Sequence, residues 1–284
     1  MDYFRLQLGG GTIDVDIEPG KLAVTHEQLK DWVTWAAKSI VAYYGRFPVD
    51  HLTIHIERFE GDGVRGGHTF GRDDGGRIRI DVGDQTTLAG LHEDWMMTHE
   101  MVHLSFPSVP GDHHWIEEGI ATYVEPVARL RAGYLTESQV WGDVARDMWQ
   151  GLPQPGDQGL DHTHTWGRTY WGGAMFCLLA DVEIRKRTHE QKGLEHALRA
   201  ILNDGGNIAQ DWDLERAFKA GDQATGVPVL EELYHKMKDQ PMNVDLDELW
   251  RNLGIERKNE VTTCSNSAPL ASVREAISFG KTGQ

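Results

Sequence analysis

The hydrophobic periodicity of this chain changes near residue 92, and this change constrains the possible folds more than any other feature. Before it, residues 51–56 and 77–82 alternate apolar and polar side chains as strands do, and residues 3–17 alternate around a glycine triplet, which predicts a hairpin. After it, apolar residues recur at helical spacing near residues 92–105, 115–131, 136–150, 168–188, 190–202, 211–221, 227–239 and 245–253. Strands followed by helices predict an α+β fold, in which a small N-terminal β-sheet is followed by a mostly α-helical lobe.

One helix is expected before this change. Thr25 and Gln28 fit a capping box, and apolar residues then recur at helical spacing as far as about Tyr44. No long linker or internal repeat divides the 284 residues. We therefore expect one continuous unit made of an N-terminal β-rich part with one helix (1–91), a helical lobe (92–257) and a C-terminal tail (258–284).

The charge balance excludes several classes of protein. The chain has 28 Lys+Arg against 44 Asp+Glu, a formal net charge of −16. Because proteins that bind nucleic acid or anionic membranes need a basic surface, we expect no nucleic-acid partner. The longest apolar stretch, residues 174–180, is too short for a membrane span.

The cellular compartment is not indicated by the sequence. Cys177 and Cys264 allow at most one disulfide, and their positions do not decide whether they pair. The first residues lack the basic and apolar regions of a signal peptide, so the protein is either cytoplasmic or periplasmic or secreted with a trimmed leader.

His99, Glu100 and His103 form an HExxH run within a segment of helical periodicity. Histidines four residues apart share one helix face, so both imidazoles can bind one cation, while Glu100 lies beside them, towards a metal-bound water. A catalytic zinc requires a third protein ligand. The extended pattern HExxHxxGxxH does not supply it, because Phe106 and Val109 occupy the positions of its glycine and histidine.

Glu118 is the expected third ligand. A loop with two prolines and a glycine follows His103 and can turn the chain back before the next helical segment. Glu117 lies about 100° around that helix from Glu118 and should face elsewhere. His113 and His114 are weaker alternatives, because loop histidines are more often exposed or hydrogen-bonded than metal-bound.

These residues resemble the motifs of the gluzincin clan of zinc peptidases. The pattern HExxH at 99–103 is followed by WxxEGxxxYxE at 115–125, and the runs RAGYLT at 131–136, YWGGA at 170–174 and LLADVEIR at 178–185 are similar to the glycyl aminopeptidase family. The resemblance covers about residues 50–253. It implies a thermolysin-like catalytic fold, one Zn²⁺ between the sheet and the helical lobe, and zinc-dependent hydrolysis of a peptide or protein substrate.

The resemblance also implies roles for individual residues. His99, His103 and Glu118 match the zinc ligands, Glu100 the general base, and Tyr170 a tyrosine that stabilises the oxyanion. Tyr170 has an alternative role, since it could simply pack at the amphipathic start of a buried helix.

Glu125 follows Glu118 by two helical turns and shares its face. There it can accept the free N–H of a ligand imidazole; the alternative is a solvated helix glutamate. Pro126, directly after it, is expected to kink or end the helix.

Residues 66–71 depart from the pattern of zinc aminopeptidases. The corresponding strand of those enzymes carries a carboxylate that holds the substrate's free amine, whereas Gly66, Gly67, His68 and their neighbours include none. The segment can still bind substrate backbone as an edge strand. Either Glu57 or Glu60 replaces the missing carboxylate, or the cleft accepts internal peptide bonds, and we favour the second.

The sequence therefore predicts a zinc-dependent metallopeptidase with Glu100 as general base. The alternative is a catalytically weak, zinc-binding scaffold of the same fold that binds peptides or proteins. The missing amine-binding carboxylate favours the scaffold, and the intact Glu100 favours the enzyme.

Overall fold

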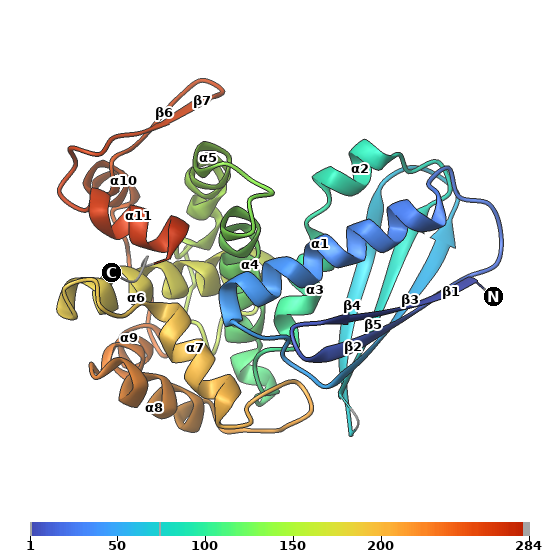
Figure 1. Cartoon of the computed structure of the whole chain (residues 1–284). Helices are drawn as coiled ribbons and strands as arrows, with labels where there is room; N and C mark the ends of the chain where they lie inside the picture. The colour runs from blue at the N-terminus through green and yellow to red at the C-terminus, as the bar shows by residue number, and fades with distance from the viewer. Residues whose placement is uncertain (1, 74, 281–284) are drawn as a thin grey trace.

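The computed structural model describes residues 2–73 and 75–280 and contains a five-stranded sheet beside a helical lobe (Figure 1). The strands are β1 (Asp2–Leu8), β2 (Gly11–Ile17), β3 (His51–Phe59), β4 (Val64–Arg72) and β5 (Gly75–Gly83), in the order β1-β2-β3-β5-β4. β2, β3 and β5 run parallel, whereas β1 and β4 are antiparallel to their neighbours. β4 is therefore an edge strand.

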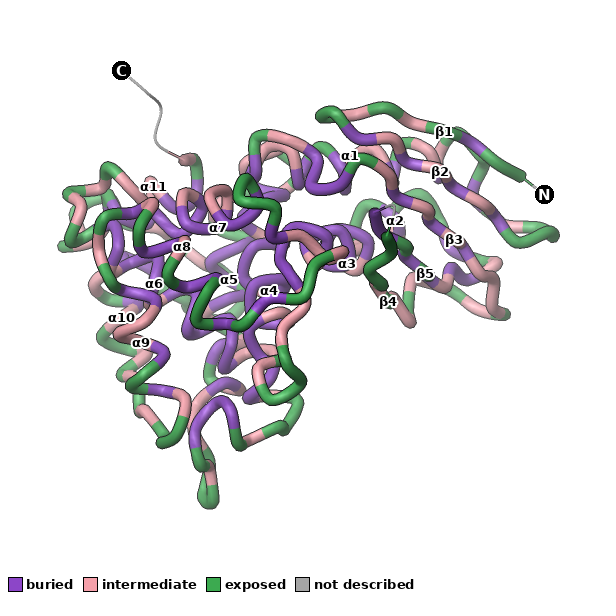
Figure 2. Tube along the Cα trace, turned by 90° about the horizontal axis from the view of Figure 1, so that it is seen from below, coloured by how far each residue is buried: buried purple, intermediate pink, exposed green. Residues whose placement is uncertain are grey.

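Helix α1 (His26–Tyr44) covers one face of the sheet (Figure 1). It begins at the Thr25–Gln28 capping box and ends at Gly45, which adopts the left-handed conformation. Alternate residues of the central strands, such as Ile13, Ile54 and Ile80, are fully buried on this face. Figure 2 shows the buried residues continuing into the helical lobe, so the sheet and the helices share one hydrophobic core.

The remaining α-helices follow β5 in the chain: the first two lie next to the sheet, and the later ones form the helical lobe (Figure 1). They are α2 (Leu88–Glu93), α3 (Met96–His103), α4 (His114–Arg131), α5 (Glu137–Asp147), α6 (Gly173–Arg187), α7 (Leu194–Asn203), α8 (Leu214–Thr225), α9 (Val229–Met237), α10 (Leu246–Leu253) and α11 (Ala271–Phe279). A short hairpin, β6 (Ile255–Lys258) and β7 (Val261–Cys264), precedes α11. None of the helices in the described residues combines the length and apolar character that a bilayer crossing requires.

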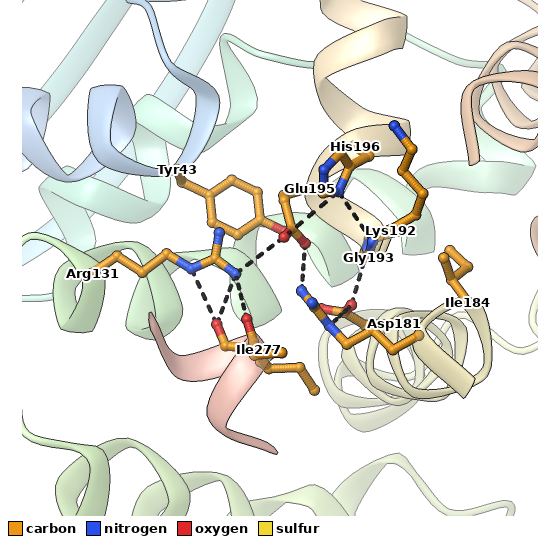
Figure 3. Close-up of polar contacts among 12 residues, drawn as sticks. Tyr43, Arg131, Asp181, Ile184, Lys192, Gly193, Glu195, His196 and Ile277 are labelled. Atoms are coloured by element: carbon orange, nitrogen blue, oxygen red, sulfur yellow. Dashed lines mark hydrogen bonds and ion pairs between the residues drawn. The ribbon is translucent and has the colours of Figure 1, made fainter. Parts of the chain in front are cut away.

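A buried ion network joins α4, α6, α7 and α11 (Figure 3). Arg185 binds Asp181 at 2.8 Å and Glu195 at 2.6 Å, and Arg131 lies 3.6 Å from the other oxygen of Glu195. Arg131 also donates to the backbone carbonyl of Ile277, which attaches α11 to α4. The network fixes the helical lobe around one cluster of charges.

Most predicted elements are present, with three differences. The segment 92–105 is two helices, α2 and α3, because Asp94 ends the first and its carboxylate accepts the N–H groups of Met96 and Met97 that begin the second. Of the kink or end expected at Pro126, the end is wrong, since α4 continues to Arg131. Residues 258–279, expected as part of a tail, contain β7 and the packed helix α11.

Cys177 and Cys264 are both free thiols, the first buried and the second partly exposed. The sequence left their pairing open, and the fold contains no bond between them.

Candidate metal centre

His99, His103 and Glu118 form a cluster between α3 and α4. One potential ligand atom from each lies within 4.8 Å of the others. Oε2 of Glu118 is 3.1 Å from Nε2 of His99 and 3.6 Å from Nε2 of His103. The helix spacing and the turn between the two helices thus bring together the three residues expected as metal ligands.

The donor set fits zinc. Two imidazole nitrogens and one carboxylate oxygen are ligands of a catalytic zinc, and ligands at 2.0–2.2 Å in a tetrahedron lie about 3.4 Å apart. The two measured N···O distances, 3.1 and 3.6 Å, lie on either side of this value. The three residues can therefore hold Zn²⁺, and three protein ligands are the number that a catalytic zinc uses.

The charges of the cluster favour an ionised carboxylate. Burial alone would raise the pKa of Glu118, but hydrogen bonds to His103, His114 and His99 outweigh burial and lower that pKa strongly. Burial would lower the pKa of His103, and the hydrogen bond and charge of Glu118 instead raise it. Glu118 is thus an anion held between imidazoles.

The neighbouring acidic and histidine residues have other partners. Glu117 accepts the N–H of Val109 at 2.9 Å and lies 3.1 Å from Nδ1 of His114. His113 lies 3.0 Å from Asp161. His114 approaches the second oxygen of Glu118 at 3.3 Å, which holds that carboxylate from the side opposite His99. His114 was expected in the loop, but it begins α4; its spacing of four residues from Glu118 could have predicted this contact.

Glu100 is buried beside the cluster and is fixed by β4. The hydroxyl of Thr69 donates to Oε2 of Glu100 at 2.6 Å and also contacts the Glu100 backbone carbonyl. A Cβ at Gly67 would lie 2.6 Å from Oε1 of Glu100, so any larger residue there would displace the Glu100 carboxylate. Thr69 could not be predicted from the sequence, because its contact joins two segments that lie 31 residues apart.

Gly66, Gly67 and His68, expected to bind substrate, lie on this edge strand at a break in its pairing with β5. Gly67 and Thr69 face Glu100, so His68, which alternates with them, points to the opposite face together with Phe70. Only the backbone of His68 is therefore available on the side of Glu100.

Tyr170 stacks on His99, with ring centroids 6.2 Å apart and planes at 18°. It lies in a π-helical turn, Arg168–Gly172, a local irregularity that is frequent at functional sites. Burial, followed by the negative charges of Glu118 and Glu100, raises the pKa of Tyr170 to about 12. The phenol is therefore a neutral hydrogen-bond donor at pH 7.

Direct backbone contact between α4 and α6 brings Tyr170 close to Glu118. A Cβ on Gly119 would lie 2.3 Å from the backbone of Gly173, and a Cβ on Gly173 would lie 2.1 Å from the carbonyl of Trp115. Glu118 directly precedes Gly119, and Tyr170 lies three residues before Gly173. The close packing of the two helices at these glycines therefore sets the distance between Glu118 and Tyr170.

Glu125 does not contact either histidine of the cluster. Its carboxylate is buried and binds Arg129 at 2.8 Å, one turn further along α4. Burial raises the pKa of Glu125 to about 7, even though Arg129 opposes this shift. The alternative of a solvated helix glutamate is also wrong, because the side chain of Glu125 is buried.

A cavity of about 700 Å³ opens beside His99. It is lined by residues from α2, α4, α5 and the turn that carries Tyr170. The candidate metal centre thus adjoins a space large enough for substrate side chains.

Solved structures of zinc peptidases share this fold. An aminopeptidase N family protein from Idiomarina loihiensis matches with a TM-score of 0.65 at 11% identity, over 94% of this chain and 53% of that one. An M1 zinc metallopeptidase from Deinococcus radiodurans matches at 0.52 and 13% identity, over 84% and 51%. Yeast LTA4 hydrolase in complex with bestatin matches at 0.52 and 13%, over 86% and 40%.

At these low sequence identities, the structural similarity establishes the fold. The chain has the arrangement of sheet and helices of M1 peptidase domains, and it spans about half the length of these structures or less. No protein-family model and no curated protein matches the sequence.

Proposed function

We propose that this protein is a zinc-dependent metallopeptidase whose zinc lies between the sheet and the helical lobe. The observation that carries the proposal is the cluster of His99, His103 and Glu118 with the carboxylate of Glu100 held beside it by Thr69. The fold shared with M1 zinc peptidases supports the same conclusion.

Each residue of the cleft has a distinct task in this proposal. When bound, zinc lowers the pKa of a coordinated water and polarises the scissile carbonyl. Glu100 accepts a proton from the attacking water and delivers it to the departing amine. Tyr170, a neutral phenol at pH 7, donates a hydrogen bond to the oxygen on which negative charge develops.

We further propose that the cleft accepts internal peptide bonds. β4 carries no carboxylate between residues 66 and 71, and neither Glu57 nor Glu60 lines the cavity beside His99. Glu57 lies 3.4 Å from Arg79 on the open face of the sheet, and Glu60 is exposed in the turn after β3.

Replacing Glu100 with glutamine tests whether the protein is an enzyme or a scaffold. Glu100→Gln keeps the shape of the side chain and is not a ligand, so zinc content and unfolding midpoint should match the wild type. Hydrolysis of a peptide library should fall at least 100-fold, because the proton acceptor is lost. Mass-spectrometric metal analysis and fluorogenic peptides provide both readouts.

Two results would contradict the proposal in different ways. Equal hydrolysis by both forms would exclude Glu100 as the base. Zinc bound by both forms, with identical peptide affinity and no hydrolysis by either, would identify the zinc-binding scaffold instead.

A further inference from the structure

Four aromatic rings form a continuous row along one wall of the cavity beside His99. Trp166 stacks on Tyr170 with centroids 5.6 Å apart, and Tyr170 stacks on His99 at 6.2 Å. On the other side of His99, Trp95 makes an edge contact at 5.3 Å. All four residues line the cavity, so its wall next to the candidate metal centre is aromatic.

The outer rings of this wall are open to solvent. Trp166 is 60% exposed and Trp95 is 48% exposed, and Tyr134, which lines the same cavity, is 38% exposed. Large apolar side chains are exposed at nine described positions, and three of these line this one cavity. Exposed aromatic surface of this kind is stabilised when another ring covers it.

Most of the charged groups that line the cavity are already paired with one another. Arg146 of α5 binds both Asp143 and Asp147, and the guanidinium of Arg129 binds Glu125. A charged substrate side chain would have to compete with these ion pairs, whereas an aromatic ring would not. Glu93 also lines the cavity without an ion pair among the described residues, so arginine-containing substrates belong in the test.

We propose that this cavity is a substrate side-chain pocket that selects an aromatic residue next to the scissile bond. The inference rests on the proposed peptidase function and names its substrate class. The substrate ring lies against the exposed ring of Trp166, and this stacking holds the adjacent peptide bond beside His99 and Tyr170. Stacking together with burial of the ring gives a preference of roughly tenfold or more for phenylalanine over alanine.

The test compares peptides that differ at one position, with Phe, Leu, Ala or Arg on either side of the cleaved bond, using the zinc-loaded protein. Trp166→Ala should reduce the Phe-to-Ala ratio of kcat/KM from about tenfold or more to less than about threefold, mainly through KM. Trp166→Phe retains a ring and should retain most of the preference. Trp149→Ala is the matched control, because Trp149 is 58% exposed and lines a separate cavity of about 960 Å³ between α5 and α10.

The possible negative results distinguish a failure of the aromatic pocket from a failure of the proposed peptidase function. Peptide hydrolysis without an aromatic preference, or an equal preference in Trp166→Ala, would overturn this inference and leave the peptidase proposal intact. A preference for Arg would show that the carboxylates lining the cavity, such as Glu93, determine specificity instead. If no peptide is hydrolysed, calorimetric binding of Phe and Ala peptides to zinc-loaded protein decides: tighter Phe binding that Trp166→Ala removes supports the pocket, and equal binding overturns it.

Discussion

At the scale of single residues, Glu117 and Glu118 show how a shift of one position along a helix changes the groups that a side chain contacts. They are adjacent in α4, yet Glu118 lies between His99 and His103 whereas Glu117 faces the backbone of Val109. The 100° between successive helical residues was sufficient to predict this difference.

Separate alanine substitutions of the two glutamates test the ligand assignment. Glu118→Ala should weaken zinc binding by more than about 100-fold, because loss of a residue that merely supports a ligand already costs 10–100-fold. Glu117→Ala should retain one zinc per chain, since it removes only the contacts to Val109 and His114. Metal content after dialysis and competition with a chromogenic chelator measure both. Full zinc binding in Glu118→Ala, with loss in Glu117→Ala, would reverse the assignment.

Residues that act through contacts distant in the chain were not predictable from the sequence. HExxH is local, so helix geometry alone places His99 and His103 on one face. Thr69 and Gly67 reach Glu100 only because β4 packs beside α3, and no sequence period encodes that contact. The predicted partner of Glu125 was a ligand imidazole, whereas the observed partner is Arg129. The face of a helix on which a carboxylate lies does not determine which buried group it contacts.

At the scale of elements, periodicity predicted the long amphipathic helices and the central strands well. It was weakest where elements are short or exposed. β6 and β7 have four residues each, and all of their residues except Ile255 are partly or fully exposed. α11 has no side-chain cap at its start and is held by Arg131 and the Trp141–Ser278 hydrogen bond, which are tertiary contacts.

The edge strand β4 leads to a prediction about substrate ends. Burying an ammonium group without an anionic partner costs several kcal/mol, so a cleft whose edge strand lacks a carboxylate should not require a free N-terminus. Paired peptides that differ only in N-terminal acetylation should therefore be cleaved at rates within about threefold of each other, or the acetylated peptide faster. Chromatography of the products gives both rate and cleavage position. Loss of cleavage on acetylation would instead identify an aminopeptidase.

At the scale of the whole molecule, the candidate site depends on how the helical lobe is held together. α4 carries Glu118 near its start and Arg131 at its end, so the same helix joins the metal cluster to the buried ion network (Figure 3). In that network Arg185 is fully buried, and Glu195 is almost fully buried between Arg185 and Arg131. A buried charge of this kind is stable only with its partners present.

Glu195→Gln should therefore destabilise the whole fold. It leaves Arg131 and Arg185 with one carboxylate fewer in a site that excludes water, and breaking a buried pair typically costs about 3–5 kcal/mol of unfolding free energy. Glu183→Gln is the matched control, because Glu183 binds Lys186 and Arg187 on the exposed side of α6, where a pair contributes about 1 kcal/mol or less. Urea unfolding of both zinc-loaded variants at one pH gives the two free energies. Equal losses in the two variants would mean that the network does not hold the lobe together, and that hydrophobic packing of α4 against α6 is sufficient to keep Glu118 in position.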